Sequence, residues 1–84
     1  MHTSAVVDSI VRVVSPYLGE TMARASARTH CEKLGIQGAE MTGEQLDALV
    51  GKLASGLAVF VGREKTSSIV QEIRKATAAQ GATA

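Results

Sequence analysis

The chain has 84 residues, a formal net charge of +1, 45% apolar residues and 20% charged residues, a composition typical of one small globular domain. So small a charge gives no long-range field toward nucleic acid or an anionic membrane, and the longest apolar run, residues 57–61, is far too short to cross a bilayer. The single cysteine, Cys31, excludes an intramolecular disulfide and a cysteine-based zinc cluster, and it favours a reducing, cytoplasmic location.

The first predicted helix follows Ser4, a suitable N-cap, and its apolar residues recur at steps of three and four. Pro16 fits the first turn of a helix better than its interior, so the pattern predicts a break or kink at Ser15. A second helix is then expected from Pro16 to about Leu34, either as a separate helix or as the second part of one kinked helix. The apolar residues of the first segment are Val6, Val7, Ile10, Val11 and Val14.

The second helix is expected to pack closely against a neighbour, because most of its apolar side chains are small. Its end is predicted at Gly35, which can adopt the left-handed conformation while Ile36 folds back onto the last turn. The small side chains are Ala23, Ala25, Ala27 and Cys31.

The third helix is predicted to begin at Thr42, since Thr42 and Gln45 have the spacing of a capping box. Its apolar stripe is the clearest in the chain, so this helix is expected to be the central one. Gly51 and Gly56 each cost about 1 kcal/mol relative to alanine, which predicts that another helix crosses closely there. The stripe consists of Leu46, Leu49, Val50, Leu53, Leu57, Phe60 and Val61.

The fourth helix is predicted over residues 64–76, after Gly62 has let the chain reverse direction. Val70, Ile73 and Ile69 are its candidate core residues. Residues 77–84 lack large apolar side chains and are expected to form a flexible tail. The sequence therefore predicts an all-α protein, a compact three- to four-helix bundle with residues 1–76 as its one domain.

Catalytic chemistry finds little support in the sequence. The stretch GLAVFVGREKT does not form a phosphate loop, because its glycines are too far apart and Lys65 does not directly follow Gly62. His30 and Cys31 are neighbours on a helix and so point about 100° apart, which prevents them from acting as a dyad. No acid and base pair stands out, so we expect no enzyme activity, no metal and no cofactor; a small enzyme subunit is the most remote alternative.

Two basic groups are the candidate partner-binding residues, and they favour an acidic protein partner. The corner after Gly62 combines basic side chains with the free amides of a helix start, which attract carboxylates. The first group lies on one face of the second helix and consists of Arg24, Arg28 and Lys33. The second group lies at the corner after Gly62 and consists of Arg63 and Lys65.

A nucleic-acid-associated helical domain is the alternative function. The span CEKLGIQGAEM resembles the turn of a helix-turn-helix, but the helix after it would present Glu40, Glu44 and Asp47 to the phosphates. Nucleic acid is therefore a disfavoured partner.

Self-association is expected through the valine-rich first helix, which is apolar over more than one stripe and so needs covering on two sides. We expect a homodimer that sets this helix against its copy. The candidate contact residues are Val6, Ile10 and Val13.

The segments SPYLGETMARASA and LASGLAVFVGREK together resemble small helical modules attached to or accompanying bacterial signalling proteins. The resemblance implies a role in regulation and carries no functional residue with it. With the composition, it favours a small non-enzymatic protein-interaction or regulatory module.

Overall fold

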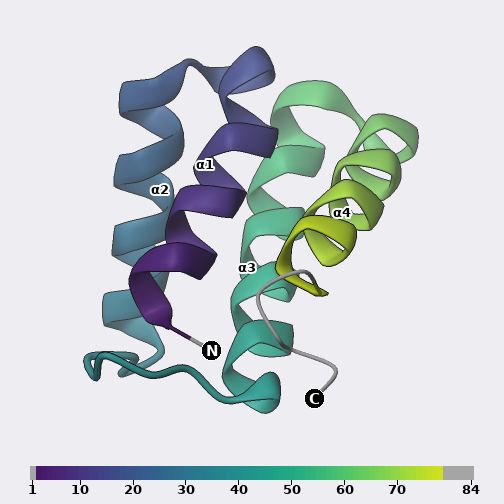
Figure 1. The fold of residues 1–84 in the computed structure, drawn as a ribbon. Coiled ribbons are helices and arrows are strands. Elements are labelled where there is room, and N and C mark those ends of the chain that lie inside the picture. Colours follow the sequence, from purple (N-terminus) through teal and green to yellow (C-terminus); the bar gives the residue numbers. More distant parts are fainter. Residues whose placement is uncertain (1, 79–84) are drawn as a thin grey trace.

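Four α-helices account for most of residues 2–78, the part of the chain that the computed structural model describes (Figure 1). They are α1 (Thr3–Leu18), α2 (Glu20–Lys33), α3 (Gly43–Val61) and α4 (Arg63–Thr77). Within this part of the chain the only β pairing is an isolated bridge between His2 and Glu40. The predicted all-α bundle is thus confirmed, in its four-helix form.

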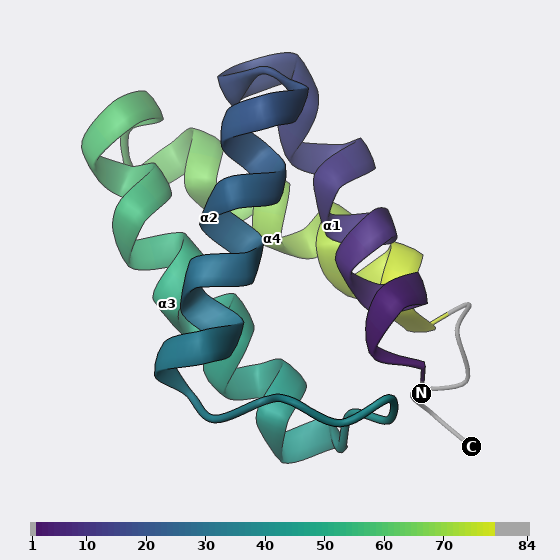
Figure 2. The same cartoon turned by 90° about the vertical axis from the view of Figure 1, so that its left-hand side faces the viewer.

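The helices pack in a closed cycle, and none of them is central. The main contacts join α1 to α2, α2 to α3, α3 to α4 and α4 to α1, and the two views in Figures 1 and 2 show the α1/α2 hairpin beside the α3/α4 hairpin. The prediction that α3 is central is therefore wrong. The physical reason is that α1 buries six residues and α3 buries five, so both helices contribute to a shared core.

The break between the first two helices lies at Gly19 and not at Ser15. Pro16 stands inside the last turn of α1, where its missing N–H leaves only one carbonyl without its helical donor. Gly19 follows with φ 86° and ψ 153°, a conformation that side-chain-bearing residues rarely adopt. The predicted helix start at Pro16 is thus replaced by Glu20, and α1 and α2 are separate helices.

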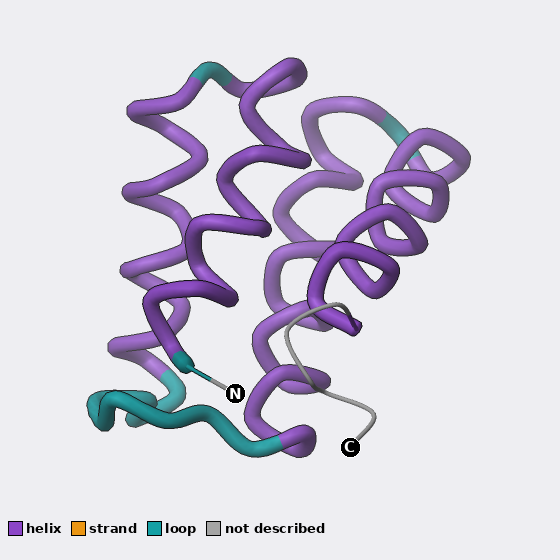
Figure 3. The backbone as a smooth tube through the Cα atoms, in the orientation of Figure 1, coloured by secondary structure: helices purple, strands orange, loops and turns teal. Residues whose placement is uncertain are grey.

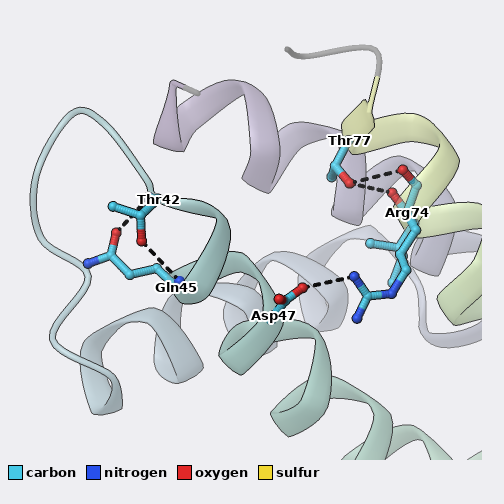
Figure 4. Close-up of polar contacts among 6 residues, drawn as sticks. Thr42, Gln45, Asp47, Arg74 and Thr77 are labelled. Atoms are coloured by element: carbon cyan, nitrogen blue, oxygen red, sulfur yellow. Dashed lines mark hydrogen bonds and ion pairs between the residues drawn. The ribbon is translucent and has the colours of Figure 1, made fainter. Parts of the chain in front are cut away.

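Local signals place the other end of α2 and the start of α3 where the sequence predicts them. Gly35 has φ 73° and donates to the carbonyl of Glu32 at 3.1 Å, while the amide of Ile36 donates to the carbonyl of Cys31 at 2.9 Å. This pair of bonds is the Schellman motif. The capping box is also confirmed, because Gln45 N donates to Thr42 Oγ1 at 3.1 Å and Thr42 N donates to Gln45 Oε1 at 2.9 Å (Figure 4).

The core is aliphatic and is shared by all four helices. Ala23 and Ala27 of α2 are nearly inaccessible, so close approach of α1 is made possible by small side chains, as predicted. Thr77 is also buried and its hydroxyl donates to the carbonyl of Ile73 at 2.9 Å, so α4 includes the first residue of the predicted tail. Residues 79–84 of that tail lie outside the described residues. The largest fully buried apolar side chains are Ile10, Leu49, Ile69, Ile73, Val6, Val14 and Val50.

The two hairpins repeat each other in their construction. Gly62 joins α3 to α4 with φ 85° and ψ 167°, close to the angles of Gly19 between α1 and α2. When the chain is aligned on these two glycines, the buried residues of α1 and α3 coincide at four positions, and an aromatic residue precedes each glycine by two. Both corners lie at the same end of the bundle, while the long loop between α2 and α3 lies at the other end (Figure 3). The coinciding pairs are Val6 and Leu49, Val7 and Val50, Ile10 and Leu53, and Val14 and Leu57.

Candidate functional site

The corner end of the bundle carries both aromatic side chains of the protein. Tyr17 is 38% exposed in the last turn of α1, and Phe60 is 64% exposed in the last turn of α3. Met22, in the first turn of α2, is 51% exposed. We refer to Tyr17, Met22 and Phe60, together with the two corners that carry them, as the corner surface.

Phe60 is exposed in the last turn of α3, although its neighbour Val61 is half-buried and packs against the core. The position of Phe60 continues the buried face through Leu53 and Leu57, which is why the sequence predicts it to be a core residue. That prediction is wrong, because the side chain of Phe60 is 64% exposed and the helix ends at the next residue, Val61. Tyr17 stands in the same relation to Ile10 and Val14 of α1. Each aromatic ring therefore extends a core stripe into solvent at the same end of the protein.

Two of the predicted partner-binding residues adjoin this surface. Arg63 and Lys65 lie in the first turn of α4, directly after the second corner, and both are exposed. Neither makes an ion pair with any residue from 2 to 78. Their charges are therefore available to an acidic group that docks at the corner.

The other predicted basic residues lie elsewhere. Arg24 donates to Asp8 Oδ1 of α1 at 3.1 Å, so its charge is already paired. Arg28 and Lys33 are exposed in the second half of α2, which leads toward the end opposite the corners (Figure 1). The five basic residues therefore do not form one binding surface, and Arg63 and Lys65 are the two that directly follow a corner.

A groove of about 650 Å³ lies between the start of α1, α2 and the loop that follows α2. Val7, Cys31 and Ile36 line it together with charged residues of both signs. Burial raises the pKa of the Cys31 thiol, which keeps it protonated and weakly nucleophilic at neutral pH. Among residues 2–78 no three His, Cys, Asp or Glu side chains come together as metal ligands. The thiol of Cys31 is thus not an activated nucleophile.

The first helix does not present its valines to solvent. Val6 and Ile10 are both 0% exposed within the single chain, where they form part of the core. Val13 is half-buried and packs against the same core. The face predicted for self-association is therefore covered by α2 and α4, since these are the main neighbours of α1. Val6 and Ile10 cannot meet a second copy while this fold is intact.

His30 makes the stability of the protein depend on pH. Its Nδ1 is buried without a hydrogen-bond partner, and burial, with the charges of Lys33 and Lys52, lowers the pKa of its imidazole. The unfolded chain, with a histidine pKa of about 6.5, then binds more protons than the folded chain. We expect the free energy of unfolding to fall as the pH drops from 7.5 to 5.5, as measured by urea denaturation. His30→Gln should reduce this fall; equal pH dependence in the native protein and His30→Gln would contradict the assignment.

None of the helices within residues 2–78 combines the length and apolarity that spanning a bilayer requires. Comparison of the chain with protein-family models, with curated proteins and with solved structures yielded no match. The resemblance to bacterial signalling modules thus stays a prediction.

Proposed function

We propose that the protein is a small, non-enzymatic protein-interaction module with a regulatory role, and that it binds its partner through the corner surface. The observation that supports this most directly is the exposure of both aromatic residues, Tyr17 and Phe60, at one end of the bundle. The chain has no tryptophan and builds its core from aliphatic side chains. Its two largest apolar side chains lie outside that core, and the exposed part of each, 38% for Tyr17 and 64% for Phe60, is available for binding.

The chemistry of this surface suits a protein partner. Aromatic side chains supply much of the binding energy of protein interfaces, because they bury a large rigid area on association. Arg63 and Lys65 place unpaired positive charge beside them, which complements an acidic rim on the partner. The expected partner therefore presents an apolar pocket or groove bordered by carboxylates.

The alternative, a nucleic-acid-associated domain, has less support. Arg24 is paired with Asp8, and the segment that resembles a helix-turn-helix continues into a helix start with exposed Glu44 and Asp47. Such a surface repels phosphates. We also propose that the interaction module acts in the cytoplasm, because its free cysteine suits a reducing compartment.

The proposal is tested by recovering partners from native cells with the immobilised protein and with a Tyr17→Ser, Phe60→Ser double variant. We expect the partners of the native protein to be lost from the double variant and retained by Val59→Ser, which removes an exposed apolar side chain next to Phe60. Circular dichroism shows whether the variants fold. Retention by apolar docking should change little up to about 0.5 M salt, whereas nucleic-acid binding falls steeply. If the double variant still retained the partners, or if they bound only at low salt, the proposal that the corner surface binds a protein partner would be contradicted.

A further inference from the structure

The groove between the start of α1, α2 and the loop that follows α2 lies toward the end of the bundle opposite the corners (Figure 1). Its volume of about 650 Å³ falls within the range of small-molecule sites, roughly 300 to 1,000 Å³. Three of its lining side chains, Val7, Cys31 and Ile36, are apolar and no more than 9% exposed. Charged side chains of α1 and α2 stand beside them, so the lining suits a small molecule with an apolar body and a charged end.

Two charges of this groove have no partner on the chain. Arg28 and Glu32 both line it and are exposed, and neither makes an ion pair with any residue from 2 to 78. The other two charged side chains of the lining, Asp8 and Arg24, are joined to each other at 3.1 Å. His2 is held by a carboxylate of the loop at 2.8 Å. One positive and one negative charge therefore remain for a ligand.

The spacing of these two charges limits what they can bind. Arg28 and Glu32 are four residues apart on α2, so they share a face with their Cβ atoms about 5 to 6 Å apart. An arginine that precedes a glutamate is the less favourable order for an ion pair at this spacing, which agrees with their not being joined. A ligand with only a carboxylate would be repelled by Glu32, and one with only an ammonium group by Arg28. A ligand that carries both groups close together satisfies both side chains.

We propose that the groove binds a small zwitterion with an apolar body, of the class of the aliphatic α-amino acids. The guanidinium of Arg28 donates to the ligand's carboxylate, a pairing that its planar fork favours. The carboxylate of Glu32 accepts from the ligand's ammonium group, and the aliphatic body contacts the apolar side chains of the groove. With so few ligand atoms and an open groove, the dissociation constant is expected at about 0.1 to 10 mM. The site is separate from the corner surface and does not depend on it.

A titration of the full chain, followed by the backbone amide signals in NMR, tests this site. L-leucine should give saturable shifts concentrated in residues 3–8, 28–32 and 36–39. Two matched probes each lack one charge: 4-methylpentanoate has no ammonium group and 3-methylbutylamine has no carboxylate. Both should bind at least about tenfold more weakly than leucine, because each leaves one side chain unpaired. Equal binding of either probe, or no saturable shift with leucine, valine, isoleucine or methionine up to about 50 mM, would overturn the proposal.

Substitutions assign the binding to the two charged side chains. Arg28→Gln and Glu32→Gln should each weaken leucine binding at least about tenfold, and both positions are exposed, so the fold should be retained. Arg63→Gln, at an exposed and unpaired arginine of the corner surface, is the matched control and should leave the binding unchanged. The Tyr17→Ser, Phe60→Ser variant should also bind leucine like the native protein, which separates this site from partner binding. Unchanged affinity in Arg28→Gln and Glu32→Gln would show that these side chains do not hold the ligand.

Discussion

Replacing Leu53 by alanine is expected to lower the free energy of unfolding by about 2 to 5 kcal/mol. Leu53 is 4% exposed in the middle of α3, the helix that packs against both α2 and α4. Truncation removes three buried carbon atoms and leaves a cavity that the neighbouring helices fill only in part. A chain of this size has little stability in reserve, so the variant should melt some 10 to 30 °C lower or remain partly unfolded.

The matched control is Val59→Ala on the same helix. Val59 is 85% exposed, so its truncation should change the free energy of unfolding by no more than about 0.5 kcal/mol. Thermal and urea denaturation of both variants, followed by circular dichroism, measures the difference between them. If Leu53→Ala were as mild as Val59→Ala, Leu53 would not lie in the core.

The parts of the fold that the sequence predicts correctly are those that depend on neighbouring residues. The capping box of Thr42 and Gln45 forms within one turn, and so does the left-handed end at Gly35. Periodic apolar residues identify the buried faces of the helices for a similar reason, because spacing along one helix decides which side chains share a face. These features need no knowledge of how the helices pack against one another.

The errors arise where the arrangement of the helices decides the outcome. Pro16 costs one hydrogen bond, and the packing of α1 along its full length outweighs that loss, so the helix continues to Leu18. The spacing of Phe60 is that of a core residue, yet its side chain is 64% exposed in the last turn of α3, where few residues of the other helices remain to cover it. The sequence likewise predicts that another helix crosses α3 at Gly51. In the structure a Cβ atom at this position would meet nothing within 4 Å, so no helix of the described residues crosses there.

The candidate site is therefore only partly readable from the sequence. Arg63 and Lys65 are predicted as partner-binding residues from the charge at a helix corner, and they do lie exposed beside the corner surface. Tyr17 and Phe60 are not predicted as binding residues. The signal that could identify them is the repeat of an aromatic residue two positions before a corner glycine, which becomes meaningful once both corners are known to lie at one end.

Gly62 and Gly51 lie eleven residues apart, and the same substitution should have opposite effects at the two positions. At Gly62, φ is 85° and ψ is 167°, a region that is nearly restricted to glycine. Gly62→Ala must therefore either hold a strained backbone or shift the corner between α3 and α4, and should lower the free energy of unfolding by about 1 to 3 kcal/mol. Space is not the obstacle, since a Cβ atom there would meet nothing within 4 Å.

Gly51 has ordinary helical geometry in an exposed part of α3, and a Cβ atom there also meets nothing within 4 Å. Gly51→Ala should raise the free energy of unfolding by about 0.5 to 1 kcal/mol, because alanine loses less backbone freedom on folding than glycine does. Urea denaturation of both variants at low micromolar concentration measures the difference in sign. Equal effects at the two positions would mean that backbone conformation does not distinguish them, and the positive φ at the α3/α4 corner would then be wrong.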